Sequence, residues 1–193
     1  VTWQVVRSEF DKMMLDNAEE KGAVVKQGAS VHQVLFDGER ATGVQVKYRN
    51  GRVKDLSASV IVDATGRSAL ISRKLKTKTV EPTLKKASIF THFKGAHRDE
   101  GIDEGATIIL NTKDKDSWFW SIPLPNDVVS VGVVGDLDYL LQSRKKSAQE
   151  ILEEELDLCL PMKARLEGAE QVFPVKVTQD FSYRSRELSG EGW

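Results

Sequence analysis

The chain has 193 residues, and its 28 basic and 29 acidic side chains give a formal net charge of −1. This balance argues against nucleic acid or a membrane surface as a partner, because both attract basic patches. The single cysteine, Cys159, excludes an intrachain disulfide, and no apolar run approaches the ~18 residues of a membrane span. Together with the lack of a signal-peptide pattern, these features favour a cytoplasmic protein. A first residue of Val1 rather than Met is expected of an excised piece.

The N-terminal part predicts a strand followed by a helix. Residues 1–6 are rich in apolar and β-branched side chains, which favours a strand. Ser8 is placed to cap a helix, and apolar residues then recur at helical spacing as far as position 18. Lys21 and Gly22 supply a basic last turn and a C-terminal stop.

A small antiparallel sheet is predicted next. Residues 30–36 read as a strand, and Asp37-Gly38 is a turn signal. Alternating apolar positions at 44–48 and a return strand at 53–58 flank Asn50-Gly51, which is a strong hairpin signal. We therefore expect a three-stranded meander.

A different pattern follows at residues 59–63, where a continuous apolar run is typical of a strand buried on both faces of a parallel sheet. Gly66 then permits a tight turn, and Ser68 can open a helix that continues to residue 74. A strand, a tight turn and a helix start form a ligand-binding edge in open α/β sheets. An ordinary strand-to-helix turn fits the same spacing.

The second half predicts antiparallel strands and a helix. Residues 76–86 are basic and polar and read as a crossing between lobes. The expected strands after it are 87–93, 106–110, 117–124, 128–135 and 171–183. Ser147 and Glu150 form a capping box that opens one long helix, which Pro161 should end or kink.

The strand expected at 117–124 carries two tryptophans at alternate positions. Trp118, Trp120 and Ile122 should stand in a row on one face, because alternate side chains of a strand share a face. Phe119 and Ser121 should point the other way. Taken alone, the pattern favours two core indoles, since aromatic residues are common in buried strands.

The same residues resemble a known signature. W-x-W-x-I-P is the motif of flavin-dependent halogenases, and Trp118, Trp120, Ile122 and Pro123 fill its fixed positions. Residues 126–134 resemble the turn and strand that follow this motif in the phenol- and pyrrole-halogenating branch. The resemblance extends to flavoprotein monooxygenases with a hydroxybenzoate-hydroxylase-like fold. It covers nearly the whole chain, but the chain matches only the middle of such a protein.

The resemblance implies a mixed α/β fold in two lobes. Residues 1–76 would be the middle of a Rossmann-like FAD-binding lobe with a β-meander, lacking the G-x-G-x-x-G unit. Residues 77–193 would form an antiparallel-sheet substrate lobe. Within the first lobe, the resemblance implies that six residues contact FAD, with Arg7 on its phosphate side, Val31 near the adenine and the remainder in its second nucleotide motif: Arg7, Val31, Asp63, Ala64, Gly66 and Arg67. The other interpretation of Arg7 is a surface ion pair with Glu9 or Asp11.

The implied activity is halogenation of an aromatic or other electron-rich small molecule, either free or bound to a carrier protein. FAD, reduced by a separate flavin reductase, would act with O₂ and a halide as co-substrates. Trp118, Trp120, Ile122 and Pro123 would wall the flavin side from the substrate side, and His92 would lie on the substrate sheet. The resemblance places the catalytic lysine and carboxylate outside this chain, so we expect the isolated chain to be inactive.

Two alternatives remain open at this stage. The same fold serves FAD-dependent monooxygenases and geranylgeranyl-reductase-like flavoproteins. A non-catalytic β-rich binding module would also explain strand tryptophans, although it does not explain why Arg7, the Asp63 turn and the tryptophan pair occur in family order. A lone histidine on a strand is usually structural, and no His, Cys or carboxylate cluster has the spacing of a metal site.

Overall fold

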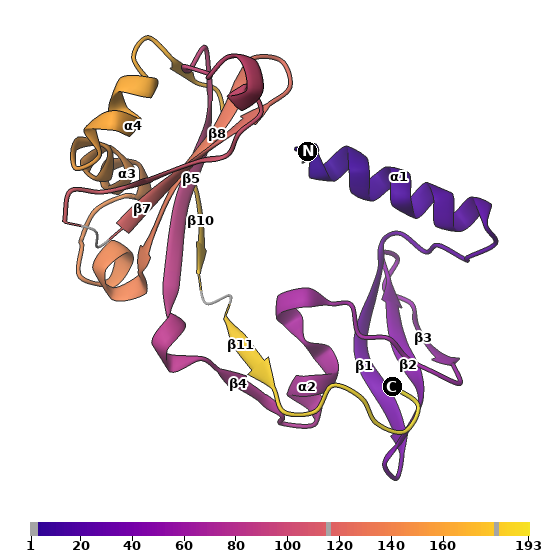
Figure 1. Ribbon diagram of the computed structural model, residues 1–193. Coiled ribbons are helices and arrows are strands. Elements are labelled where there is room, and N and C mark those ends of the chain that lie inside the picture. Colours follow the sequence, from indigo (N-terminus) through magenta and orange to yellow (C-terminus); the bar gives the residue numbers. More distant parts are fainter. Residues whose placement is uncertain (1–3, 115–116, 180–181) are drawn as a thin grey trace. The chain divides into compact units, whose positions relative to one another are not determined.

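The computed structural model describes residues 4–114, 117–179 and 182–193, and the chain divides into two compact units (Figure 1). The first unit comprises Val1–Met14 and Pro82–Ser182, and the second comprises Leu15–Glu81 and Tyr183–Trp193. No helix of the described residues combines the length and the apolar character needed to cross a membrane.

Helix α1, Arg7–Glu20, begins one residue earlier than the predicted cap, so Ser8 lies within its first turn. It ends at a turn in which Gly22 has a φ of 98°, as a C-terminal glycine should. The strand predicted at residues 1–6 is wrong for residues 4–6, which are irregular, and residues 1–3 lie outside the described residues.

The predicted meander is confirmed in the second unit. Strands β1, Ala29–Asp37, β2, Arg40–Tyr48, and β3, Val53–Ser57, pair antiparallel in the order β1-β2-β3. Gly38 and Gly51 adopt positive φ angles of 61° and 81° in the two connections, which is the conformation that these turn sequences favour.

The rest of the second unit joins segments that are distant in sequence. After the 3₁₀ turn η1, Gly66–Ser68, come helix α2, Leu70–Lys74, and strand β4, Lys78–Val80. Strand β4 pairs antiparallel with β11, Tyr183–Ser185. The core of this unit is small, and its buried members are Val34, Ala41, Ile61 and Ile71, against which Phe36, Val44, Leu70, Leu75 and Trp193 pack.

The predicted buried strand at residues 59–63 is wrong. These residues are irregular, and Val60 and Val62 are 65% and 84% exposed, while Ile61 alone of the three is buried. A strand buried on both faces needs hydrogen-bonded neighbours, and among the described residues no strand pairs with this segment. A backbone hydrogen bond joins it to the C-terminal segment, from Ile61 N to Gly192 O at 2.9 Å.

The first unit is built on an antiparallel sheet in the order β10-β5-β8-β7-β6, with the short strand β9 also pairing with β5. All four strands predicted between residues 87 and 135 are confirmed. The bounds are β5, Lys86–Lys94; β6, Ile108–Asn111; β7, Ser117–Leu124; β8, Val128–Asp136; β9, Glu170–Gln171; and β10, Lys176–Gln179. The 3₁₀ turns η2, Pro82–Leu84, and η3, Gly101–Asp103, flank β5.

Helices cover one face of this sheet (Figure 1). A π-helix, η4, spans Asp138–Gln142, and α3, Ala148–Asp157, opens with the predicted capping box of Ser147 and Glu150. The predicted long helix is two short ones, because α3 ends before Cys159 and Pro161 lies in the first turn of α4, Leu160–Arg165. The core beneath them is fully buried and includes Ile89, Phe119, Val131, Val133, Leu140, Ile151, Leu152 and Met162.

The strand predicted at residues 171–183 is divided into β9, β10 and β11. Pro174 has no backbone N–H to donate to a sheet. Instead, the neighbouring carbonyl of Phe173 accepts a hydrogen bond from the Thr91 hydroxyl at 2.5 Å. The alternation of apolar and polar residues in this segment therefore does not make it one continuous strand.

A fully buried carboxylate fastens α3 to the sheet. Glu155 is 0% exposed and accepts hydrogen bonds from the Tyr139 hydroxyl at 2.9 Å, from Arg144 at 2.5 Å and from the Ser117 hydroxyl. The guanidinium of Arg144 also lies 4.5 Å from the centroid of the Tyr139 ring. Burial and the adjacent Glu155 carboxylate together raise the pKa of the Tyr139 hydroxyl, which therefore stays a donor.

We expect Glu155→Gln to lower the free energy of unfolding by about 3 kcal/mol, because removing one member of a buried ion pair leaves the other uncompensated. The effect should fall at the low end of the usual range, since Arg144 keeps Glu154 at 3.7 Å. Urea denaturation followed by circular dichroism measures it. Glu153→Gln, at an exposed position of the same helix, is the matched control, and equal stability of the two variants would contradict the prediction.

Candidate functional site

The turn that follows residue 62 is organised by the carboxylate of Asp63. Its Oδ1 accepts hydrogen bonds from the backbone N–H of Thr65 at 3.0 Å and from the Thr65 hydroxyl at 2.6 Å. Its Oδ2 accepts one from the backbone N–H of Ile71 at 2.8 Å. Asp63 therefore caps α2 across the intervening 3₁₀ turn, a role that the sequence analysis gave to Ser68.

The hydrogen bonds also determine the charge of Asp63. Partial burial alone would raise the pKa of this carboxyl, but the bonds from Thr65, Ile71 and Leu70 outweigh it, and the pKa is lowered. Asp63 is therefore a fixed negative charge at neutral pH.

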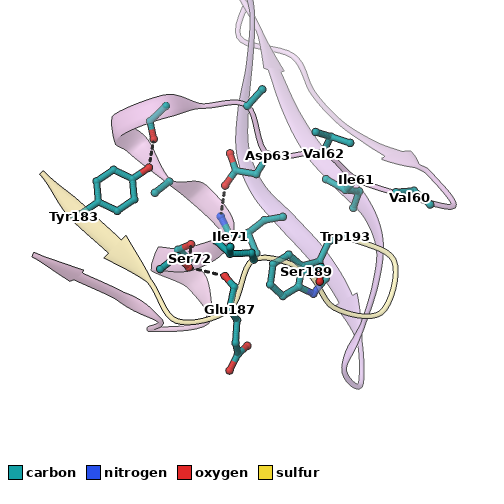
Figure 2. A pocket seen from close by; sticks show the side chains of 15 residues that line it. Val60, Ile61, Val62, Asp63, Ile71, Ser72, Tyr183, Glu187, Ser189 and Trp193 are labelled. Carbon is teal, nitrogen blue, oxygen red and sulfur yellow. Dashed lines mark hydrogen bonds between the residues drawn. The ribbon is translucent and has the colours of Figure 1, made fainter. Parts of the chain in front are cut away.

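A cavity of about 790 Å³ opens beside this turn in the second unit (Figure 2). Asp63, Ile71 and Ser72 line it from one segment, and Tyr183 and Trp193 line it from the returning C-terminal segment. Sequence reasoning missed these last two residues. The available signal was the pair of glycines before Trp193, since such glycines mark places where the backbone passes close to another segment. In the structure Gly192 has a φ of 76°, and a Cβ there would lie 2.4 Å from the Ala41 carbonyl oxygen.

The returning segment is held at several points. The hydroxyl of Tyr183, which is labelled in Figure 2, donates to the Gly66 carbonyl at 2.8 Å. The hydroxyls of Ser72 and Ser185 lie 2.7 Å apart. Backbone bonds of 2.9 Å join Ala41 N to Glu191 O and Ile61 N to Gly192 O. The cavity is consequently bounded by two segments that lie more than a hundred residues apart in sequence.

The other residues predicted for the turn lie at its exposed surface. Ala64, Gly66 and Arg67 are all exposed, and Gly66 has a φ of 59° with open space where a Cβ would be. An exposed glycine turn of this kind lets a ligand approach the backbone closely. These residues and the cavity fit the ribose and phosphate groups of a dinucleotide, and their roles in binding one stay predictions.

Arg7 and Val31 lie on elements other than the turn, namely α1 and β1. Arg7 makes two 3.0 Å hydrogen bonds to Asp11, its side chain is 77% exposed, and this pairing raises its pKa. That geometry is the surface ion pair considered as the alternative. Val31 lies exposed on β1, paired with Val46. Their contacts with a cofactor remain predictions.

In the first unit, the tryptophan row lies on the sheet face opposite the helices. Phe119 and Ser121 are buried in the core, whereas Trp118 is 37% exposed and Trp120 and Ile122 are partly buried. The predicted alternation is confirmed, and Trp118 is too exposed for the core residue that its strand alone favoured, whereas Trp120 is partly buried. Pro123 is buried and lies beyond the end of β6, whose pairing with β7 stops at Ser121, so its missing N–H leaves no sheet bond unmade.

Aromatic rings surround Trp120 on this face, which we call the aromatic face. Phe90 of β5 lies 5.9 Å from Trp120 between ring centroids, and Trp118 lies 6.4 Å away. The indole Nε1 of Trp120 donates to the Ser130 hydroxyl at 3.3 Å.

His92 shares this face, because it pairs in register with Ser130. Its ring stacks on Phe173 at 5.0 Å, and burial lowers its pKa, so the imidazole is neutral at pH 7. The described residues contain no group of three His, Cys, Asp or Glu side chains arranged to hold a metal ion. His92 is therefore part of an apolar and aromatic surface.

A sequence model of the tryptophan halogenase family matches residues 1–168. The chain belongs to the tryptophan halogenase family. A curated relative is the 1H-pyrrole-2-carbonyl peptidyl-carrier protein brominase of Pseudoalteromonas luteoviolacea, which is 31% identical over 195 residues. That match covers 100% of this chain and 47% of the brominase, so the chain spans less than half the length of this family member.

Solved structures agree with this assignment. The myxobacterial chondrochloren halogenase CndH, a variant of FAD-dependent halogenases, is 28% identical and superimposes with a TM-score of 0.92 over 99% of this chain and 44% of its own. A flavoprotein/dehydrogenase from Cytophaga hutchinsonii, 26% identical, gives a TM-score of 0.85 over 99% of this chain and 46% of its own. The fold of this family member is therefore the predicted mixed α/β fold.

For the Asp63 turn we expect Asp63→Asn to be most destabilising at neutral pH. The folded-state pKa of Asp63 is lowered, so its carboxylate stabilises the fold above the unfolded pKa of about 3.9 and loses that effect as the pH falls through the folded value. The difference in unfolding free energy between wild type and variant should be about 1–2 kcal/mol at pH 7 and should shrink at pH 3. Urea denaturation at both pH values tests this, with Asp55→Asn on exposed β3 as the control, and a difference that grows on acidification would contradict it.

For β7 we expect opposite faces to respond differently to truncation. Phe119→Ala should cost about 3–5 kcal/mol of unfolding free energy, because it empties a packed core, whereas Trp118→Ala should cost much less. Both values come from urea denaturation of the two variants beside wild type. If Trp118→Ala lowered the unfolding free energy as much as Phe119→Ala does, Trp118 would have to be regarded as a core residue.

Proposed function

We propose that this chain is the central part of an FAD-dependent halogenase that acts on an electron-rich aromatic small molecule. The observation that carries the proposal is the aromatic face. The family's tryptophan pair is directed away from the core of the first unit and lies within an extended surface of aromatic rings.

The Asp63 turn and the adjoining cavity would hold part of the cofactor. The exposed backbone of residues 64–67 would lie against its phosphate groups, and Oδ2 of Asp63, which accepts one hydrogen bond from Ile71, would accept a second from a ribose hydroxyl. When bound and reduced, FAD would supply two electrons that bring O₂ to the peroxide level, and this oxidant would take two electrons from the halide to give hypohalous acid, with oxidised FAD and water as the other products. The residues of this chain would bind the cofactor, orient it and exclude the substrate from it. The catalytic lysine and carboxylate that the family implies would lie outside this chain.

The aromatic face would act as a wall that keeps the substrate from direct contact with the cofactor. Indole and phenyl rings provide a large rigid surface that loses little conformational entropy when it packs against a ligand. The neutral His92 and the stacked Phe173 extend the same surface without adding a charge. Direct oxygen transfer to the substrate would thereby be suppressed in favour of halogenation.

The substrate class and partners follow from the relatives as proposals. One relative acts on a pyrrole held by a peptidyl-carrier protein, as its name states, so a carrier-bound aromatic acyl group is a substrate to test beside free aromatic molecules. A separate flavin reductase would supply the reduced cofactor.

A second candidate is a flavoprotein oxidoreductase that does not halogenate, such as a monooxygenase. The flavoprotein/dehydrogenase of Cytophaga hutchinsonii favours keeping it, because its structure matches this chain with a TM-score of 0.85. The two candidates differ in their need for halide.

The test uses the whole protein with reduced FAD, O₂ and a panel of phenols and carrier-bound pyrroles, with and without bromide or chloride. We expect halide-dependent products from the wild type. Trp118→Ala and Trp120→Ala should keep FAD but lose halogenated product and release more peroxide or oxygenated product. Oxygenated products that ignore halide in the wild type would move the assignment to the second candidate. Variants that retain FAD and halogenate as the wild type does would remove the proposed role of the wall.

A further inference from the structure

A glycine lies at the centre of the aromatic face. In sheet register, Gly132 of β8 stands between Phe90 of β5 and Trp120 of β7. Its neighbours on β8 that share the same face are Ser130 and Val134. The site proposed above has given this glycine no role.

Backbone freedom does not explain Gly132, because its φ lies outside the left-handed region that requires glycine. The space around it does. A Cβ at this position would lie 2.3 Å from Cζ2 and 2.5 Å from Cη2 of Trp120, and 2.5 Å from Cβ of Phe90. These distances are far below the 3.5–4.0 Å of favourable carbon contacts. The six-membered ring of the Trp120 indole therefore lies where a side chain of residue 132 would be.

The indole is held there from several sides. The backbone of Gly132 lies beneath it, Phe90 lies beside it, and Ser130 accepts the hydrogen bond from its Nε1. In this placement the rings of Trp120 and Trp118 are tilted by 58° to each other. Even one methyl group at position 132 must displace the indole, because Cβ of Phe90 is fixed to its own strand.

We propose that Gly132 is a positioning residue of the aromatic face. Its missing side chain lets the Trp120 indole lie across β8, and this sets the distance and tilt between the two tryptophans. The role rests on the proposed function, in which that wall separates substrate from cofactor. Any side chain at position 132 lifts the indole out of the sheet surface and changes the shape of the wall, although Trp120 itself is retained.

The structural test is circular dichroism of the chain, in which two indoles 6.4 Å apart produce an exciton couplet. Trp118→Phe removes one indole of the pair, so the difference between its spectrum and that of the wild type is the couplet of Trp118 and Trp120. Gly132→Ala should weaken or invert that couplet. Gly135→Ala is the matched control, because the same substitution on the same strand places a Cβ 2.8 Å from Cδ1 of Leu140 in the core rather than against an indole. A couplet that is unchanged in Gly132→Ala, or altered equally in Gly135→Ala, overturns the proposal.

The functional test is made on the whole protein loaded with FAD. Halide-dependent turnover should fall by about 10- to 100-fold in Gly132→Ala with FAD content unchanged, as small displacements within an active site can cause. Folded, FAD-loaded Gly135→Ala should stay near the wild type. Equal turnover of Gly132→Ala and wild type overturns the positioning role. If the wild type turns over without halide, the proposed function fails, while the couplet still decides whether Gly132 positions Trp120.

A double variant keeps the test decisive if Gly132→Ala does not fold. Trp120→Ala removes Cζ2 and Cη2, the two indole atoms that a Cβ at position 132 would meet. We expect Gly132→Ala to be clearly less destabilising in the Trp120→Ala background than in the wild type. Equal destabilisation in both backgrounds would show that the indole does not occupy this space and would overturn the proposal.

Discussion

The alternation of side chains along β7 is the constraint on which the first unit depends. A strand can bury one set of alternate positions, and a slip of one residue in its pairing would exchange the sets. The observed pairing places Phe119 in the core and leaves the two indoles on the opposite face. The register with β8 fixes this choice, because the side chains of Val131 and Val133 on that strand face the core. Between them lies Gly132, and glycine is the residue type that leaves room for the ring of Trp120.

A second constraint is the buried charge between α3 and the helix-covered face of the same sheet. Glu155 is removed from water on α3, yet three side chains from two other segments supply its hydrogen bonds. Such a network adds little to the free energy of unfolding compared with well-packed apolar side chains of similar size. It does make other positions of the helix unfavourable, because a displaced helix would leave the carboxylate or Arg144 buried and unpaired. The face opposite the helices is thereby presented on a rigid base.

The sequence predicted these elements where the determining signals were local. The hairpins at Gly38 and Gly51 and the capping box at Ser147 depend on neighbouring residues, and each was confirmed. The two faces of β7 were predicted correctly, but β7 alone favoured a core position for the indoles, and only the alternation of valine with serine and glycine on β8 indicates which face of the sheet is the core. The run at residues 59–63 failed because a strand depends on its partners, which its own residues do not reveal. The hydrogen bond from Ile71 N to Asp63 was not predicted, because a capping side chain is normally expected within three residues of the N–H that it accepts from. Here a 3₁₀ turn lies between the two residues.

The pairing of β4 with β11 has a consequence for the order in which the chain folds. The sheet of the first unit is complete once β10 has been made, and nearly all its contacts then lie within one continuous stretch. Most of the second unit, Leu15–Glu81, precedes that sheet in the chain, but it still lacks β11, the partner of β4, and Trp193, which packs against its core. At a synthesis rate of about 5–20 residues per second, its early part waits roughly 5–20 seconds while the intervening hundred residues emerge. During that interval the backbone N–H groups of Ile61 and Ala41 lack the carbonyl partners that they have in the folded chain, so this part of the second unit cannot reach its final structure before the last residues have been made.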